Sequence, residues 1–448
     1  MSDSAYTLLI DHIPGETRWA VLRDDILTNL HIDRAGTTQA RANVQIGDIY
    51  KGRVVNIVAS LQAAFVDIGG DQNAFLPVSA TFADDISKAF HQGEQILVQV
   101  RQTPQGDKGA VLTCKIDLNA DDCVLTPNRP GINVSRKFKD TDKRSAFKAL
   151  LTDHLPDDCG LIVRTSAENQ EPDAILHQAQ SLISQWASIE SSQDKAPSLL
   201  LAAQGFLESQ WDRYKHLCFD RIIVEGLSAY QEMQRLTEQT EFHNDARLLF
   251  EAEGVESQIE EAAHKTVALP GGGNIVIEPT TALIAVDVNM AERTDNRNLD
   301  ENHLRTNLAA LDVLADQMVL RNLSGQILID FISLKNKNHK HKLEQAVHQK
   351  LKDKRTTFHG LTKLGLGEVS RKRKGTDLPS LLNAPENTFY ALLRQLSKGT
   401  THRRVSLGSH LYAIWMAHPP TWLSDRLGFD LKPIEDKTLK PLAYRLEE

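Results

Sequence analysis

Two short apolar runs that each end in aspartate dominate the pattern of hydrophobic and polar positions. The first covers residues 283–289 and the second covers residues 327–332. Between them, apolar residues recur every three or four positions over residues 304–318, which is the spacing of a helix with one buried side. The pattern therefore predicts a strand, a helix and a second strand, with Asp287 and Asp330 at the strand ends.

Shorter apolar segments precede this unit. Residues 7–10 and 17–22 predict two strands joined by a turn at Pro14-Gly15. Five short runs then follow in residues 45–118 and predict a small closed barrel of the OB type. These runs cover residues 48–55, 63–68, 74–76, 96–100 and 110–113.

The remaining segments have clear periods as well. Residues 160–165 predict a strand, residues 174–189 a helix, and residues 221–224 a strand among helices. The long helix between the aspartate runs is expected to end near residues 322–325, with Gly325 as its stop. Residues 385–448 predict a small terminal domain.

Composition places the chain among ordinary globular proteins. It has 448 residues, 41% of them hydrophobic and 25% charged, which suits several domains. No apolar run of about 18 residues predicts a membrane span, and the first residues lack the pattern of a secretion signal. The four cysteines are scattered without a CxxC pair, which favours the reducing cytoplasm and argues against a thiolate zinc site.

Charge is unevenly distributed. The net charge of −8 argues against nucleic-acid binding, but basic residues gather over residues 335–355 and again over residues 371–374. Local stripes bind phosphates whatever the total charge, since fields fall off within about 8–10 Å in physiological salt. Arg371 and Arg373 of the second cluster are therefore expected to contact RNA. A solvated helix face is the alternative for the first stretch.

The aspartate strands predict a metal site. Residues two apart on a strand face the same side, so Asp287 and Asn289 point together. Neighbouring strands lie about 4.8 Å apart, and Asp330 on the adjacent strand can share a cation with Asp287. Oxygen ligands suit Mg²⁺, with Mn²⁺ as the alternative, and Asn289 can bond Asp330 or a phosphate. In the competing interpretation, each aspartate caps a loop or pairs with an arginine.

The predicted barrel contains candidate RNA contacts. Phe65 and Phe75 flank a glycine turn and can share one face, where aromatic rings stack on single-stranded bases. Arg53 and Lys108 can supply positive charge. From composition alone, such phenylalanines are more often part of a core.

A polar strand end offers a second candidate contact. Arg164 and Thr165 close the strand of residues 160–165, and Arg136 lies upstream. A guanidinium group with a hydroxyl suits a terminal phosphate. A surface arginine without function is the alternative.

These residues together resemble the ribonuclease E/G family of endoribonucleases. The likeness runs from the first strand to about residue 380, and its most specific part is the aspartate segment. The matching stretches are residues 47–53, 63–69, 160–165, 285–289, 321–323, 327–332 and 368–373.

The resemblance implies a multi-domain α/β fold. A ribonuclease-H-like subdomain would be split over residues 1–44 and 198–262. An S1-type OB barrel at residues 45–118 and a 5′-phosphate sensor at 119–197 would lie between its halves. A DNase-I-like catalytic subdomain would cover residues 263–384, followed by a small domain at 385–448.

The resemblance also implies roles for the candidate residues. Asp287 and Asp330 would bind Mg²⁺, with Asn289 assisting. The two barrel phenylalanines would hold RNA beside the scissile bond, against the expectation from composition. The polar strand end would read a 5′-monophosphate. The products would carry 5′-phosphate and 3′-hydroxyl ends.

One departure changes the expected assembly. Family members carry a CPxCxG segment whose thiolates share zinc between protomers, but residues 373–385 contain no cysteine. No zinc is expected, and any homo-oligomer would form without this link. The larger family members also carry a long disordered scaffold tail. This sequence has none, so it is similar to the short, ribonuclease-G-like form.

The leading hypothesis is a cytoplasmic, Mg²⁺-dependent endoribonuclease that cleaves single-stranded RNA in processing or decay. A non-catalytic RNA-binding factor that kept the fold is one alternative. A DNA nuclease is another.

Overall fold

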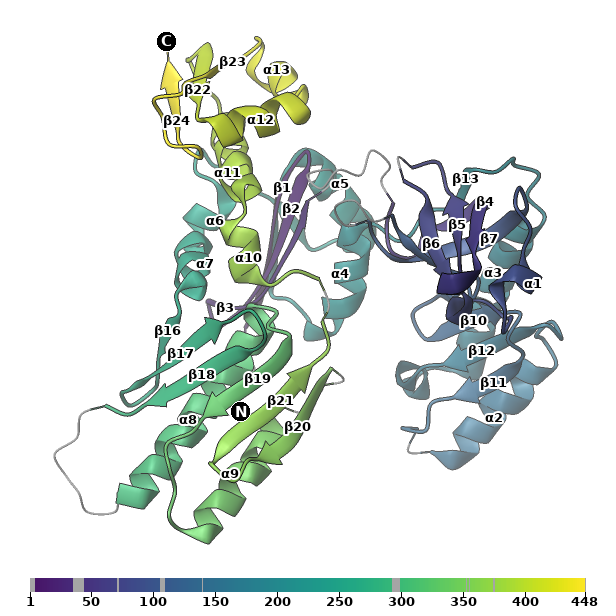
Figure 1. The fold of residues 1–448 in the computed structure, drawn as a ribbon, viewed down its shortest axis with the longest axis horizontal. Coiled ribbons are helices and arrows are strands. Elements are labelled where there is room, and N and C mark those ends of the chain that lie inside the picture. The colour runs from purple at the N-terminus through teal and green to yellow at the C-terminus, as the bar shows by residue number, and fades with distance from the viewer. Residues whose placement is uncertain are drawn as a thin grey trace. The chain divides into compact units, whose positions relative to one another are not determined.

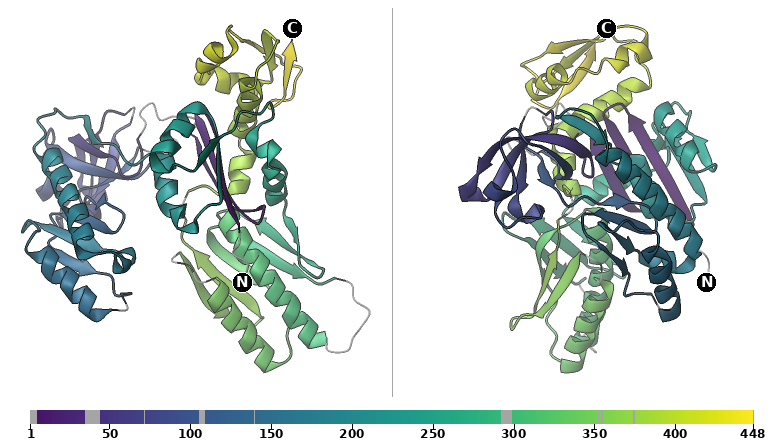
Figure 2. Two further views of the ribbon diagram at one scale, coloured as in Figure 1. Left: turned by 180° about the vertical axis from the view of Figure 1, so that it is seen from behind. Right: turned by 90° about the vertical axis from the view of Figure 1, so that its right-hand side faces the viewer.

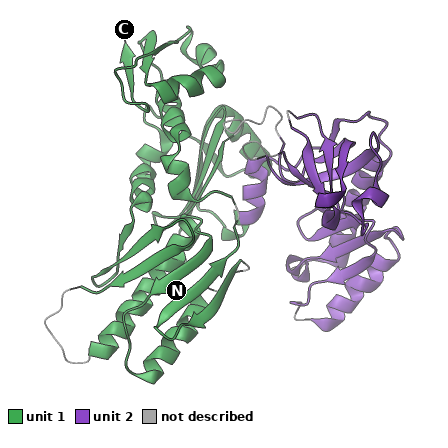
Figure 3. Ribbon diagram, viewed as in Figure 1, with its two compact units in different colours: residues 1–34, 214–448 green, residues 35–213 purple. Residues whose placement is uncertain are grey.

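The computed structural model describes residues 5–34, 44–70, 72–104, 109–138, 140–291, 299–351, 353, 355–373 and 375–447. The chain divides into two compact units, which are coloured separately in Figure 3. The first unit combines residues 1–34 with 214–448, and the second covers residues 35–213. Among the described residues, no helix has both the length and the apolar character that crossing a membrane requires.

The first unit contains a five-stranded sheet built from both ends of its sequence. Its order is β15-β14-β1-β2-β3, in which β1, β2 and β3 are antiparallel to their neighbours among these three and β14 and β15 run parallel to β1. The strands are β1 (Tyr6–Ile13), β2 (Glu16–Arg23), β3 (Ile26–Arg34), β14 (Arg221–Glu225) and β15 (Thr240–Phe242). Helices α5 (Leu227–Leu236), α6 (Leu249–Ala252) and α7 (Val255–Ala263) follow β14 in the chain.

The predicted strands at residues 7–10, 17–22 and 221–224 are confirmed, but β3 had not been predicted. It follows a two-residue turn at Asp24-Asp25, where both residues have positive φ. Aspartate tolerates this conformation, and no glycine marks the turn in the sequence.

The second sheet of this unit carries the two aspartates. Its order is β16-β17-β18-β19-β21-β20. The strands are β16 (Thr266–Ala268), β17 (Asn274–Pro279), β18 (Ile284–Asn289), β19 (Gly325–Asp330), β20 (Thr356–Leu361) and β21 (Leu366–Arg371). Helices α8 (Leu299–Leu320) and α9 (Lys337–Lys350) run side by side along one face of the sheet (Figures 1 and 2).

The predicted strand–helix–strand unit is confirmed, but Gly325 is not the residue that stops the helix. Helix α8 ends at Leu320, and Asn322 adopts the left-handed conformation with φ 50°. Asparagine is the residue that most often replaces glycine after a helix end. Gly325 instead begins strand β19.

The C-terminal residues build a small three-stranded sheet with its own apolar core. The sheet order is β23-β22-β24, and its core also includes Ile13 of β1. Its elements are α10 (Leu378–Asn383), α11 (Pro385–Ser397), β22 (Arg404–Leu407), α12 (Ser409–Ala417), α13 (Trp422–Leu427), β23 (Lys432–Glu435) and β24 (Tyr444–Glu447).

The second unit begins with the predicted barrel, and all five predicted strands are present. They are β4 (Ile49–Val58), β5 (Ala63–Asp67), β6 (Ala74–Pro77), β7 (Gln95–Gln102) and β8 (Val111–Thr113). Pairing of β4 with β7 closes the barrel, and β13 (Ser198–Leu201) adds to β4.

A four-stranded sheet follows, in the order β11-β12-β10-β9. Its elements are β9 (Leu118–Asn119), β10 (Cys123–Pro127), β11 (Gly131–Val134), α2 (Thr141–Thr152), β12 (Cys159–Val163) and α3 (Pro172–Glu190). The predicted strand at 160–165 and helix at 174–189 are thereby confirmed.

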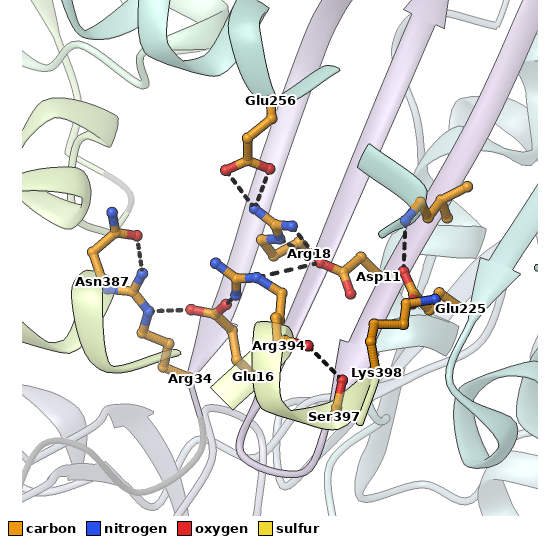
Figure 4. A network of polar contacts seen from close by, with 11 residues as sticks. Asp11, Glu16, Arg18, Arg34, Glu225, Glu256, Asn387, Arg394, Ser397 and Lys398 are labelled. Carbon is orange, nitrogen blue, oxygen red and sulfur yellow. Dashed lines mark hydrogen bonds and ion pairs between the residues drawn. The ribbon is translucent and has the colours of Figure 1, made fainter. Parts of the chain in front are cut away.

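A buried ionic network joins helix α11 to the first sheet (Figure 4). Asp11 pairs with Arg18 and lies 3.8 Å from Arg394, which also pairs with Glu16. All four side chains are at most 5% exposed. Burial by itself raises the pKa of the Asp11 carboxyl, but the guanidinium groups of Arg18 and Arg394 outweigh it and hold this pKa below its ordinary value.

Replacing Arg394 by methionine should destabilise the first unit. A buried pair that loses one partner costs about 3–5 kcal/mol of unfolding free energy. The lowered pKa of Asp11 contributes stability at neutral pH that is lost as pH falls through that pKa. Without Arg394, Asp11 keeps its pair with Arg18 but loses one of the two guanidinium groups that lower its pKa. The variant therefore has less of this pH-dependent stability to lose, and its deficit against wild type shrinks toward pH 4.

Urea unfolding at pH 7 and at pH 4 measures this difference. Arg445→Met is the matched control, because Arg445 is 59% exposed and its pairs with Asp436 and Glu447 lie at the surface. It should change the unfolding free energy by about 0–1 kcal/mol. Equal effects of the two substitutions would contradict the structural role of Arg394.

Candidate active site

The alternation of side chains along β18 and β19 separates an apolar face from a polar one. Val286 and Val288 of β18 and Ile327 and Ile329 of β19 are buried in one core with residues of α8 and α9. Successive residues of a strand point to opposite faces, so the intervening side chains lie on the face away from these helices. Asp287, Asn289 and Asp330 are exposed there.

The two aspartates lie directly opposite each other. Strands β18 and β19 are parallel, and Asp287 pairs with Asp330 in the register. Directly opposed residues project to the same face, and neighbouring strands lie about 4.7–4.9 Å apart. The carboxylates thus come from like ends of adjacent strands, which is the juxtaposition that the sequence pattern predicts.

Asn289 supports Asp287. Its Nδ2 donates to Asp287 Oδ2 at 3.0 Å and to Asn274 Oδ1 of β17 at 3.3 Å. The amide therefore bridges two strands and fixes the orientation of one carboxylate. The sequence analysis predicted that Asn289 bonds Asp330 or a phosphate. In the structure its carboxylate partner is Asp287.

The donor set fits a divalent cation that keeps part of its water shell. Among the described residues, no cluster of three or more His, Cys, Asp or Glu side chains forms a complete protein cage. Mg²⁺ is commonly bound by one or two carboxylates plus waters and substrate phosphates. Two adjacent carboxylates on an exposed face meet that requirement, and they leave room for a phosphate.

The structure corrects the expectation for Arg371. Its side chain is buried, and Nη1 donates to the carbonyls of Met318 at 3.0 Å and Leu323 at 2.6 Å. Burial lowers the pKa of this guanidinium, and nearby Asp353 pairs with it at 3.3 Å. Arg371 therefore fastens the end of α8 to β21 and is not a surface contact for RNA. Arg373 is exposed and stays a candidate.

The basic stretch of residues 335–355 lies mainly on α9. This helix covers the apolar face of the sheet, opposite the face that bears the aspartates. Lys350 pairs with Asp312 of α8 at 2.6 Å. Closeness in sequence to Asp330 therefore does not put these lysines beside the carboxylates.

The barrel phenylalanines share one face, as predicted. Phe65 of β5 pairs with Phe75 of β6, and the ring centroids lie 5.9 Å apart in an edge-to-face arrangement. Both rings are partly exposed, while the flanking residues of both strands, such as Ala64 and Leu76, are fully buried. The rings therefore point outward from the barrel. Arg53 is exposed and donates to the carbonyl of Ala196 at 2.7 Å, and Lys108 lies outside the described residues.

The predicted phosphate contacts come together at the ends of parallel strands. Arg136 follows β11, and Arg164 and Thr165 follow the adjacent β12. Thr165 Oγ1 lies 2.8 Å from Ser135 Oγ. The Arg164 guanidinium, however, is held by Asn119 Oδ1 at 2.7 Å and by the carbonyls of Ala120 and Asp121.

Sequence reasoning missed a group of α8 side chains that contact the chain after Asp330. Asn307 bonds the backbone of Ile332, and His303 bonds that of Ser333. The signal was an asparagine among the apolar positions of a helix, where this residue is unfavourable without a specific partner.

Two family models match the chain. Residues 118–374 match the one described as "Ribonuclease E/G family", and residues 43–115 match the one described as "S1 RNA binding domain".

Curated relatives match over most of the chain. Ribonuclease G of Salmonella typhimurium (strain SL1344) is 33% identical over 398 residues, covering 82% of this chain and 79% of that protein. Ribonuclease G of Escherichia coli (strain K12) is 32% identical over 407 residues, covering 84% and 81%. Ribonuclease E of the same strain is 31% identical over 418 residues, covering 88% of this chain but 38% of that protein.

The two arginines near residue 371 should behave differently when replaced by leucine. Arg371→Leu removes the donor to two buried carbonyls. Each carbonyl left unpaired should lower the free energy of unfolding by about 1–3 kcal/mol. Arg373→Leu alters an exposed side chain, so its free energy of unfolding should stay within about 0.5 kcal/mol of the wild-type value. Urea unfolding measures both, and a stable Arg371→Leu protein would refute the structural role.

Proposed function

Because the chain belongs to the ribonuclease E/G family, we propose that it is an endoribonuclease that cleaves single-stranded RNA with Mg²⁺ held by Asp287 and Asp330. The observation that carries this proposal is the in-register pairing of the two aspartates on the exposed face of the sheet. Paired carboxylates without a cation repel each other, and a divalent ion relieves the repulsion.

The chemistry follows from these side chains. The carboxylates of Asp287 and Asp330 hold the ion, and Asn289 orients Asp287 through its 3.0 Å hydrogen bond. A bound Mg²⁺ polarises a phosphoryl oxygen and lowers the pKa of a bound water. Attack of water on phosphorus breaks the bond to the 3′ oxygen, which leaves with a proton. The products then carry a 5′-phosphate and a 3′-hydroxyl.

Substrate recognition is assigned to the second unit. The partly exposed rings of Phe65 and Phe75 offer stacking surfaces for unpaired bases, which supports a preference for single strands. Arg53 supplies charge beside the same strands. Arg136 and Thr165 offer a guanidinium group and a hydroxyl for a 5′-monophosphate, with Arg164 shaping the neighbouring loop.

The strand orders support the proposed division into domains. Three antiparallel strands from residues 1–44 join two parallel strands from 198–262, as a split ribonuclease-H-like subdomain requires. Residues 45–118 form the barrel and residues 119–197 hold the proposed sensor. We assign the two-layer unit in 263–384 to the DNase-I-like catalytic subdomain, because it carries Asp287 and Asp330.

Changing Asp287 or Asp330 to asparagine should abolish cleavage while RNA binding persists. Metal-assisted charge stabilisation is worth several kcal/mol, and about 1.4 kcal/mol is a factor of ten, so we expect a loss of about a thousandfold or more. Cleavage of 5′-monophosphorylated RNA in Mg²⁺ and then in EDTA measures it. Glu368→Gln is the control. Glu368 is an exposed carboxylate of β21, and its partner in the strand register is Leu328 rather than either aspartate.

Cleavage retained in both asparagine variants would refute the metal site. RNA binding by the wild-type protein without any cleavage in Mg²⁺ or Mn²⁺ would instead favour a non-catalytic RNA-binding factor. Cleavage of a DNA substrate at the same rate would identify a less selective nuclease.

Replacing Phe65 or Phe75 by alanine should weaken RNA binding without unfolding the barrel. A stacked base contributes about 1–3 kcal/mol, so each substitution should raise the Kd for a short single strand by roughly 5–150-fold. Phe82→Ala is the matched control, because Phe82 is 53% exposed in the same unit but lies outside the β5–β6 pair. Fluorescence anisotropy with a labelled oligoribonucleotide measures Kd, and equal affinities for all three variants would contradict the stacking role.

A further inference from the structure

Helix α8 grips the chain directly after Asp330. The contacts come from Asp300, His303 and Asn307, which we call the α8 clamp, and they reach the backbone of residues 332–336. Residues three and four apart lie on one face of a helix. The clamp is therefore one row of polar side chains facing the segment that leaves β19.

Asn307 is the centre of the clamp. Its side chain is fully buried, with Nδ2 donating to the carbonyl of Ile332 at 2.8 Å and Oδ1 accepting from the Ile332 N–H at 2.9 Å. A buried amide is costly unless it is hydrogen-bonded, and here both of its polar ends have a partner. Neither bond stabilises α8 itself, so the contact acts on the segment after Asp330.

The other two members of the clamp, His303 and Asp300, bond the backbone further along the chain. His303 Nδ1 lies 2.9 Å from the carbonyl of Ser333, and because a carbonyl only accepts, Nδ1 carries the proton. Asp300 accepts from the backbone N–H groups of Lys335 at 2.6 Å and Asn336 at 3.4 Å, and it also bonds His339 Nδ1 at 2.6 Å. Asp300 thereby holds the start of α9.

The clamp begins where the sheet stops holding the chain. Asp330 is the last residue of β19 that pairs with either neighbour, facing Asp287 of β18 and Leu366 of β21. The backbone after it would be free to shift if nothing else held it. Asn307 takes over two residues later, so the backbone is fixed on both sides of Asp330.

We propose that Asn307 and His303 are positioning residues for the catalytic site. By fixing the backbone at Ile332 and Ser333, they hold the Asp330 carboxylate where it shares a cation with Asp287. Neither side chain touches the substrate. The inference rests on the proposed function, because it requires Asp330 to be a metal ligand.

The test compares variants that remove the clamp with variants that keep it. Asn307→Leu removes both amide bonds at similar volume, and His303→Leu removes the bond to Ser333. His303→Asn is the conservative variant, because the asparagine Nδ2 can donate from the position of the histidine Nδ1. Leu311→Ala is the stability control, since Leu311 is buried on α8 in the same core and its apolar side chain makes none of the clamp's hydrogen bonds.

Three readouts separate positioning from general stability. Isothermal titration measures Mg²⁺ affinity, hydrogen exchange measures protection of residues 331–336, and anisotropy in EDTA measures RNA affinity. Loss of a residue that orients a ligand typically costs about 10–100-fold in metal affinity or activity. We expect that loss for Asn307→Leu, with a smaller loss for His303→Leu, faster exchange in 331–336 and unchanged RNA affinity. His303→Asn and Leu311→Ala should keep wild-type Mg²⁺ affinity.

Several outcomes would overturn the proposal. Faster exchange in Asn307→Leu with unchanged Mg²⁺ affinity would show that the clamp only stabilises the fold. A Leu311→Ala protein with the same loss of Mg²⁺ affinity would show the same. If the Asn307→Leu protein does not fold, the comparison of His303→Leu with His303→Asn serves as the test. Equal Mg²⁺ affinity of these two variants would reject the proposal. Failure of the proposed function has a different signature, namely Asp330→Asn protein that still binds Mg²⁺ and cleaves.

Discussion

The account depends on the register between two parallel strands. Asp287 and Asp330 face each other because Val286, Val288, Ile327 and Ile329 bury their side chains against helices α8 and α9. A slip of one residue would turn every side chain of a strand to the opposite face and would drive an aspartate into the core. The apolar residues thus fix the positions of the charged ones. Asn289 then bonds the Asp287 carboxylate, and the α8 clamp holds the backbone two residues after Asp330.

The first sheet of the same unit shows what happens when the protein supplies the positive charge itself. Asp11 of β1 and Glu225 of β14 also face each other at the ends of adjacent parallel strands. There the counter-charges are Arg18 and Arg394 for Asp11 and Lys398 for Glu225, and Asp11 is almost fully buried (Figure 4). Across the described part of the chain, neither Asp287 nor Asp330 forms such an ion pair, and both are exposed. The two pairs have one geometry, and their surroundings give one a structural role and leave the other open to a cation from solution.

The sequence predicts the parts of this structure that local patterns determine. The apolar runs at residues 283–289 and 327–332 predict the aspartate strands, and the close spacing of such runs over residues 45–118 predicts the strands β4 to β8 of the barrel. Prediction from the sequence fails where tertiary contacts determine the position of a side chain. Arg371 belongs to a cationic cluster in the sequence, yet it lies on the buried side of β21, where carbonyls of Met318 and Leu323 need a donor. The lysines near Asp330 follow α9 to the opposite face of the sheet. Asn307 reads as a polar interruption of a helix until its partner, 25 residues away in the chain, is known.

Crystals soaked with Mn²⁺ test the central claim most directly. Manganese takes the oxygen ligands that suit Mg²⁺ and scatters anomalously, so its position can be measured independently of activity. The account predicts one anomalous peak within about 2.0–2.2 Å of a carboxylate oxygen from each of Asp287 and Asp330, and its loss in the Asp330→Asn protein. A peak bound by only one of these residues, or a site elsewhere with this face left empty, would contradict the proposed catalytic centre.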